Sequence, residues 1–123
     1  MMARAEIEQL IPHRPPFLWI DPEEPALGGH FPGKPILPGI FLIEAVAQTA
    51  GVMLGSAAPP EPGATPMLAA VNRFKFLRPV LPGQEMRIVT TMLTGAGKMA
   101  CIAGEVTVNG VTVAVGELTV LQA

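Results

Sequence analysis

Residues 36–54, ILPGIFLIEAVAQTAGVML, form the longest apolar stretch of the chain, and they constrain its fold more than any other segment. Pro38 and Gly39 interrupt its beginning, which leaves about 15 uninterrupted helical residues where a membrane span needs about 20. Glu44 and Gln48 stand in the middle, where a bilayer would penalise them. The pattern therefore predicts a helix buried inside a soluble protein, apolar on nearly all sides, and no association with a membrane.

Four strand-like runs follow this helix, at residues 67–77, 85–94, 98–108 and 111–121. Asn109-Gly110 is typical of a type I′ hairpin turn, and Pro82-Gly83 and residues 95–97 mark the other turns. A glycine at position 55 predicts the end of the helix. One apolar helix followed by an antiparallel meander indicates a single α+β domain over residues 1–123, in which the sheet curls around the helix.

The part of the chain before the apolar helix contains shorter elements. Residues 3–10 suit an amphipathic helix that ends at Ile11-Pro12, and residues 17–20 suit one strand. Residues 28–39 are predicted to form a loop, because they contain three prolines and four glycines.

The composition favours apolar contacts beyond the core of one protomer. Half of the 123 residues are hydrophobic and 15% are charged, whereas a chain of this size buries only about two thirds of its unfolded surface. The surplus predicts subunit contacts or an apolar ligand channel, and a chain that is not stable as a monomer.

Charge and cysteine content exclude several function classes. The formal net charge is −2, and no lysine or arginine cluster is long enough to follow a nucleic acid backbone. Cys101 is the only cysteine, which excludes an intrachain disulfide and a multi-thiolate metal site. Residues 1–10 lack the apolar stretch of a secretory signal, so we expect a cytoplasmic protein.

Glu44 is the first candidate for chemistry. A carboxylate midway along an apolar helix loses several kcal/mol if it stays charged and unpaired. Gln48, one turn further on the same face, can hold it in a purely structural pair. We favour a functional site, because a carboxyl group kept protonated by burial can act as a general acid at neutral pH.

The second candidate is the loop at residues 29–39, GHFPGKPILPG. Its three prolines give a rigid path that presents His30 just before the helix. Gly39 leaves a bare backbone N–H at the helix N-terminus, where the helix dipole helps to stabilise a developing oxyanion. A rigid turn with an incidental imidazole is the alternative for His30.

The remaining reactive side chains are predicted to be structural. His13 has no acidic neighbour in the sequence, and Cys101 has no neighbouring base. The chain contains no tyrosine, no glycine-rich nucleotide loop and no metal-ligand spacing. We therefore expect no nucleotide-binding loop and no metal site.

Four motifs occur in order along the chain: LIPHRPPFL at residues 10–18, GHFPGKPILPG at 29–39, IEAVAQ at 43–48 and FKFLRPVLPG at 74–83. Together they resemble the 3-hydroxyacyl-(acyl carrier protein) dehydratases of fatty acid synthesis. The most specific part is an HFPGxPxxPG string followed five residues later by a glutamate. Agreement is looser through the final hairpin.

This resemblance implies a hotdog fold, in which an antiparallel sheet wraps the central helix and two protomers form a tunnel between them. It also implies that His30 and Glu44, contributed by different protomers, are the catalytic pair. His30 would take a proton from C2 of the substrate, the N–H of Gly39 would stabilise charge on the thioester oxygen, and Glu44 would protonate the leaving hydroxyl. Gln48 would orient Glu44. Glutamate rather than aspartate at position 44 argues against double-bond isomerisation.

The partner implied by the resemblance is acyl carrier protein, which carries the substrate on its own phosphopantetheine arm, so the resemblance also implies that no cofactor resides in this chain. Lys34, Lys75 and Arg78 are the basic residues expected to dock this acidic protein. The implied assembly is a homodimer or a hexamer built as a trimer of dimers.

The chain departs from the family pattern before His30. Relatives carry a long hairpin there, whereas this chain has only nine residues, 21–29. The hairpin is therefore expected to be shortened or missing, through natural trimming, absence of that stretch from this sequence, or a different closure of the sheet.

Other functions stay open: hydration of coenzyme A thioesters, a non-catalytic subunit that binds acyl chains, and thioesterase action, which fits least well. Neither the acyl chain length nor the choice among fatty acid, polyketide and aryl-polyene pathways follows from the sequence.

Overall fold

The computed structural model describes residues 5–6, 9, 36–58, 62–63 and 65–122 of the chain. Within them the elements are α2 (Gly39–Ala57), β1 (Pro66–Phe76), β2 (Met86–Ala96), β3 (Met99–Val108) and β4 (Val111–Gln122). The four predicted strands are confirmed to within two residues at each end. Ala5, Glu6 and Gln9, which belong to the predicted first helix, are helical. The predicted strand at 17–20 lies outside the described residues, as does the predicted loop up to residue 35.

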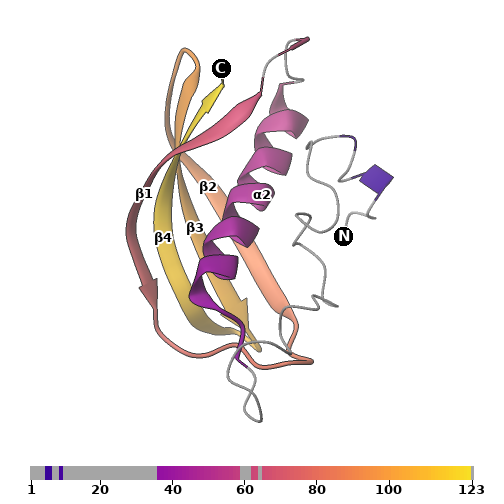
Figure 1. Cartoon of the computed structure of the whole chain (residues 1–123), viewed down its shortest axis with the longest axis vertical. Coiled ribbons are helices and arrows are strands. Elements are labelled where there is room, and N and C mark those ends of the chain that lie inside the picture. Colours follow the sequence, from indigo (N-terminus) through magenta and orange to yellow (C-terminus); the bar gives the residue numbers. More distant parts are fainter. Residues whose placement is uncertain (1–4, 7–8, 10–35, 59–61, 64, 123) are drawn as a thin grey trace.

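The helix α2 lies along the concave face of a curved four-stranded sheet (Figure 1). Leu42, Val46 and Ala50 recur every four residues and are buried against the sheet, as the apolar pattern predicts. By length and composition alone α2 could also cross a membrane, but such a helix is equally typical of a protein core, and here it packs on strands. Burial of each of its large apolar side chains stabilises the fold by about 1.5–3 kcal/mol.

The end of α2 differs from the prediction. The helix continues two residues past Gly55 to Ala57, and the extended residue Ala58 follows it and donates its N–H to the carbonyl oxygen of Leu54 at 3.0 Å. Gly55 keeps a helical backbone, so it does not adopt the left-handed conformation by which a glycine ends a helix.

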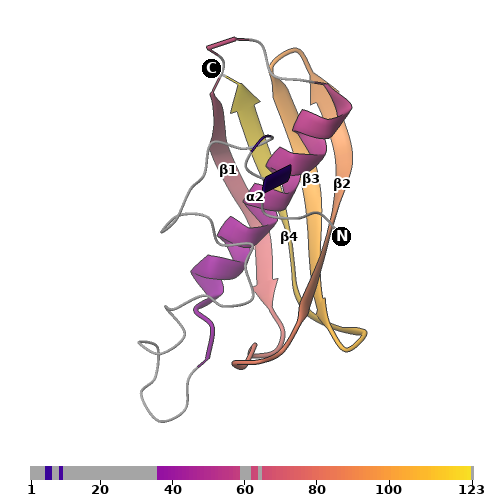
Figure 2. The same cartoon turned by 90° about the vertical axis from the view of Figure 1, so that its right-hand side faces the viewer.

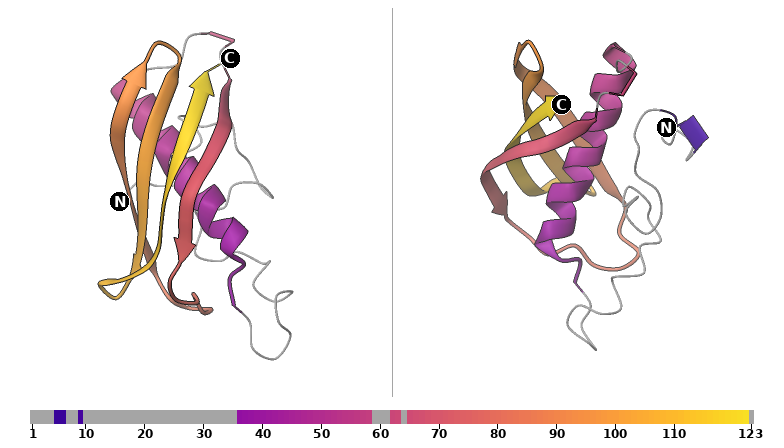
Figure 3. Two further views of the ribbon diagram at one scale, coloured as in Figure 1. Left: turned by 90° about the vertical axis from the view of Figure 1, so that its left-hand side faces the viewer. Right: turned by 45° about the horizontal axis from the view of Figure 1, so that its top comes forward.

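The strand order is β1-β4-β3-β2, and every neighbouring pair is antiparallel (Figures 2 and 3). Strands β2, β3 and β4 form the expected meander, but β1 pairs with β4 instead of β2, so the prediction of one continuous meander is wrong for β1. The chain after β1 passes the start of α2, where the N–H of Leu37 donates to the carbonyl oxygen of Val80 at 2.9 Å. After this contact the chain continues to β2, at the opposite edge of the sheet.

The predicted turns are confirmed by their backbone angles. Asn109 and Gly110 both have positive φ, at 51° and 77°, as a type I′ turn requires. Gly83 has φ of 82° in the Pro82-Gly83 turn, which the N–H of Gln84 closes by donating to the carbonyl oxygen of Leu81 at 3.2 Å.

Two glycines of the sheet allow close packing, one against α2 and the other against Phe74. Gly104 in β3 and Gly116 in β4 are cross-strand partners, and both are buried. A methyl group at Gly104 would collide with Val46 of α2, and one at Gly116 would collide with the ring of Phe74. The absence of a side chain at Gly104 therefore sets the depth at which α2 packs, and its absence at Gly116 makes room for the ring of Phe74.

Both edges of the described sheet expose apolar side chains. Met67, Leu68 and Val71 on β1 are more than 40% exposed, and so are Val89, Met92 and Leu93 on β2. This distribution agrees with a chain whose apolar surface exceeds what its own core covers.

Candidate active site

The site begins where Pro38 precedes the first residue of α2. Pro38 has an extended conformation, with φ of −56° and ψ of 137°, and it makes no side-chain cap on the helix. Its carbonyl oxygen accepts a hydrogen bond of 2.9 Å from the N–H of Phe41. The N–H groups of Gly39 and Ile40 belong to the first turn, which has no intrahelical acceptor for them, and they lie at the positive end of the helix dipole.

The start of α2 is held against the chain that follows β1. Leu37 and Val80 are both buried in the main core, and the hydrogen bond between their backbones joins the two segments. Further along, the N–H groups of Leu77 and Arg78 donate to the carbonyl oxygen of Val113, at 2.8 and 3.3 Å. The segment that holds the helix start is therefore itself anchored to β4.

Glu44 and Gln48 form the side-chain pair that the sequence predicts. Gln48 is fully buried, and its Nε2 donates a hydrogen bond of 2.9 Å to Oε1 of Glu44. Glu44 itself is half-buried. The bond confirms that Gln48 holds Glu44, and the remaining exposure of Glu44 leaves its carboxyl group reachable by a ligand.

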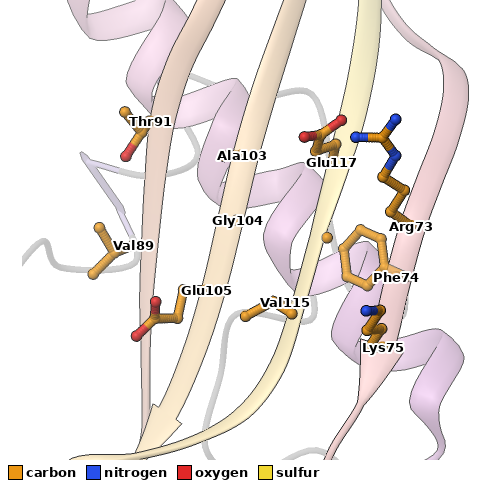
Figure 4. A pocket seen from close by; sticks show the side chains of 11 residues that line it. Arg73, Phe74, Lys75, Val89, Thr91, Ala103, Gly104, Glu105, Val115 and Glu117 are labelled. Atoms are coloured by element: carbon orange, nitrogen blue, oxygen red, sulfur yellow. The ribbon is translucent and has the colours of Figure 1, made fainter.

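Of the basic residues expected to dock a partner, Lys75 borders a hollow on the sheet face that points away from α2 (Figure 4), and Arg78 belongs to the chain that follows β1. Lys75 stands near the end of β1 and Arg78 follows that strand, and both are exposed. Between them, the ring of Phe76 lies against Gly39. His30 and Lys34 lie outside the described residues, so their positions relative to Glu44 stay predictions, and the same holds for the structural role of His13.

The sequence analysis did not single out Phe76. Its contact with Gly39 joins residues that are far apart in the chain, and strand periodicity alone does not distinguish it from any other edge residue. The sequence feature that comes nearest to indicating this contact is Gly39, a residue without a side chain at the start of a helix of mostly large apolar residues.

Other reactive groups of the described chain stand apart from Glu44. Cys101 is half-buried on β3, as expected for a strand residue. Among the residues that the structure describes, His, Cys, Asp and Glu form no group of three or more that could hold a metal ion.

A hollow of about 640 Å³ lies on the sheet face that points away from α2 (Figure 4). Its lining includes Arg73, Glu105 and Glu117. Glu105 alternates along β3 with the buried Val106, which packs toward α2, so this hollow and Glu44 are on opposite faces of the sheet. The hollow is therefore not the channel that would deliver an acyl chain to Glu44.

Comparison with known proteins identifies the family. The FabA-like domain family matches residues 17–117, and the chain belongs to this family. The 3-hydroxyacyl-(acyl carrier protein) dehydratase FabZ of Solibacter usitatus is 35% identical to it, over 92% of this chain and 80% of that protein. FabZ of Ruegeria sp. is 37% identical, over 94% of this chain and 85% of that protein.

The alignment lengths agree with the missing hairpin. The match to the Solibacter protein spans 130 aligned positions but only 92% of 123 residues, about 113, so roughly 17 positions of the alignment have no counterpart in this chain. This difference has the size of a hairpin, and its place before His30 stays a prediction of the sequence analysis.

Solved structures of low sequence identity share the fold. The dehydratase heterocomplex ApeI:P from Xenorhabdus doucetiae has a TM-score of 0.79 at 20% identity, and the match covers 95% of this chain and 90% of that one. The fluoroacetyl-CoA thioesterase FlK has a TM-score of 0.66 at 14% identity, over 77% of this chain and 67% of that one. These similarities confirm the hotdog arrangement of a helix in a curved antiparallel sheet.

Proposed function

We propose that this protein removes water from 3-hydroxyacyl thioesters of acyl carrier protein and forms trans-2-enoyl thioesters in fatty acid synthesis or a related pathway. Its membership of the FabA-like family and its FabZ relatives support this activity. The observation that carries the proposal is the half-buried carboxyl of Glu44, held by the buried amide of Gln48 on the helix whose open N-terminus is Gly39.

The proposed reaction uses two groups in the first part of α2, the N–H of Gly39 and the carboxyl of Glu44, together with His30. His30 takes the proton from C2, and the N–H of Gly39 stabilises the negative charge that grows on the thioester oxygen. Glu44 protonates the hydroxyl that leaves from C3 as water. Gly39 and Glu44 are five residues apart, which at 1.5 Å of rise per residue is about 7.5 Å along the axis. One β-hydroxy thioester can span this distance, because the Glu44 side chain leans back toward the helix N-terminus.

The working assembly in this proposal is a homodimer that joins protomers along β1, in which His30 of one protomer serves Glu44 of the other. The exposed apolar side chains of β1 support this edge as the seam, because burying Met67, Leu68 and Val71 removes apolar surface from water. A hexamer, as a trimer of such dimers, is the larger alternative.

Acyl carrier protein docks in this proposal on Lys34, Lys75 and Arg78. Arg78 is exposed and lies two residues after Phe76, whose ring contacts Gly39, so an acidic partner bound there would deliver its arm toward the helix start. Lys75 is exposed beside the hollow on the other face of the sheet and would attract the same partner from that side. The protein works in the cytoplasm, and its acid, base and oxyanion donor all belong to the chain itself.

The test replaces Glu44 with glutamine and measures hydration of a crotonyl thioester in the reverse direction. Loss of a positioned general acid predicts a fall in kcat of about 10²–10⁴-fold with the fold retained. Glu105→Gln, an exposed glutamate on the opposite face of the sheet, is the matched control and keeps wild-type activity. Near wild-type activity of Glu44→Gln would end the assignment.

A second measurement separates the alternatives. Turnover of acyl carrier protein thioesters well above that of coenzyme A thioesters supports the dehydratase over a coenzyme A hydratase. A correctly folded dimer without either activity would instead indicate a non-catalytic subunit. The non-catalytic alternative is worth testing because one structural neighbour, ApeI:P, is a dehydratase heterocomplex.

A further inference from the structure

We infer that Phe76 is a positioning residue for this reaction: its ring holds the first turn of α2, so that the N–H of Gly39 stays aimed at the thioester oxygen. This inference rests on the proposed function and adds to it a residue on another element. The ring also keeps water from the side of the helix start that it covers.

The contact between the ring and Gly39 is tight. A methyl group built on Gly39 would lie 3.1–3.2 Å from the Cε1, Cδ1 and Cζ atoms of Phe76. Gly39 has a helical backbone and no positive φ, so its conformation does not require glycine. A side chain at position 39 would therefore require the ring or the first turn to shift by a few tenths of an ångström.

The ring is held in place by the shape of β1. The register of β1 against β4 shifts between Asn72 and Lys75, and Arg73 in this bulge has φ of 55°. A bulge bends its strand, and the end of β1 lies beside the start of α2 (Figures 1 and 2). Phe74 supports Phe76 from the core side, with ring centroids 6.2 Å apart.

Core packing alone does not account for Phe76. Its side chain is 49% exposed, although Phe74 two residues earlier packs on the main core. A ring that seals the core would be covered, whereas this ring leaves half of its surface free beside the open N–H groups of the first turn. That placement suits a group that borders bound substrate.

The position of the turn matters because an oxyanion donor must lie about 2.7–3.1 Å from the developing charge. A displacement of about 1 Å can lower the rate of a positioned reaction by roughly 10²-fold. A ring packed on the α-carbon of Gly39 limits such displacement.

The experiment is a double-mutant cycle in the full-length protein with a crotonyl thioester as the probe. Gly39→Ala alone is expected to lower kcat about 10–100-fold, because the methyl group displaces the ring or the turn. Phe76→Leu together with Gly39→Ala is expected to regain at least about tenfold of this loss, because leucine leaves room for the methyl group. Phe76→Ala alone lowers kcat more than it changes KM. Leu81→Ala, an apolar residue of similar exposure after the same strand, is the control and changes kcat less than about threefold.

The outcomes distinguish this inference from the proposed function. If the double variant is no better than Gly39→Ala, or if Phe76→Ala keeps the wild-type kcat, the positioning role of Phe76 is wrong while the activity stands. If Glu44→Gln is fully active or the wild-type protein turns over neither thioester, the proposed function fails and this inference fails with it. Circular dichroism and unfolding midpoints of all variants show whether each activity change reflects a folded protein.

Discussion

Gln48 is completely buried, and its side-chain amide donates a hydrogen bond of 2.9 Å to the half-buried carboxyl of Glu44, one helical turn earlier. The amide therefore fixes Oε1 of Glu44 from the core side of the helix. The position of the Glu44 carboxyl group therefore depends on how Gln48 is packed in the core.

Gln48→Leu is expected to lower kcat by about tenfold, because a lost hydrogen bond of about 1.4 kcal/mol to the reacting group corresponds to that factor. Thr49→Val is the matched control: it removes the hydrogen bond that Thr49 Oγ1 donates to the carbonyl oxygen of Ala45 at 2.8 Å, on the same helix. Steady-state kinetics with a crotonyl thioester measures both. Equal losses in the two variants would mean that Gln48 acts only through helix stability.

Gly104→Ala is expected to destabilise the fold by about 1–3 kcal/mol, because the new methyl group collides with Val46 of α2. Gly95→Ala is the control, since a methyl group there meets only the sulfur of Met92, at 3.9 Å. Urea unfolding followed by circular dichroism gives both values. Val46→Ala in the Gly104→Ala background should restore part of the loss, and failure to do so would contradict the proposed collision.

Charge reversal at Lys75 and Arg78 is expected to raise KM for an acyl carrier protein thioester by about tenfold at low salt, because in the proposed function these bases dock the acidic carrier protein. KM for a coenzyme A thioester should change much less, and salt should reduce the difference between variant and wild type. Arg87→Glu, an exposed base on β2, serves as the control. Equal effects on both substrates would contradict a docking role.

If the proposed homodimer joins along β1, Val71→Glu is expected to shift it to monomer at micromolar concentration, because the variant places a charge on the apolar edge of β1. Val111→Glu introduces the same charge at a position of similar exposure, at the start of β4, and should leave the dimer intact. Sedimentation velocity measures both. Activity should fall with dissociation if His30 comes from the partner protomer, and a Val71→Glu dimer would show that the seam lies elsewhere.

Local patterns predicted most of the described fold. The period of the apolar residues indicated α2, and alternation with turn dipeptides indicated four strands to within two residues. The Glu44–Gln48 bond also followed from helical spacing, because residues four apart share a face. These features depend on neighbours in the chain, which a sequence displays directly.

The errors arose where distant segments meet. The pairing of β1 with β4 depends on the crossing of two distant segments near Leu37 and Val80. The error at Gly55 is of a different kind: the sequence predicted a helix end there, whereas α2 continues to Ala57. The distance between His30 and Glu44 stays a prediction, because His30 lies outside the described residues.

The amino-acid sequence by itself determined the apolar central helix, the strands and turns, the family motifs and the residue types available for acid–base chemistry. Only the tertiary structure decided which edge β1 occupies, that Gly104 sets the depth of α2, and that the ring of Phe76 lies on Gly39. The physical reason is that periodicity and turn preference are local, whereas contacts between residues far apart in the chain arise from how whole elements fill space around one core.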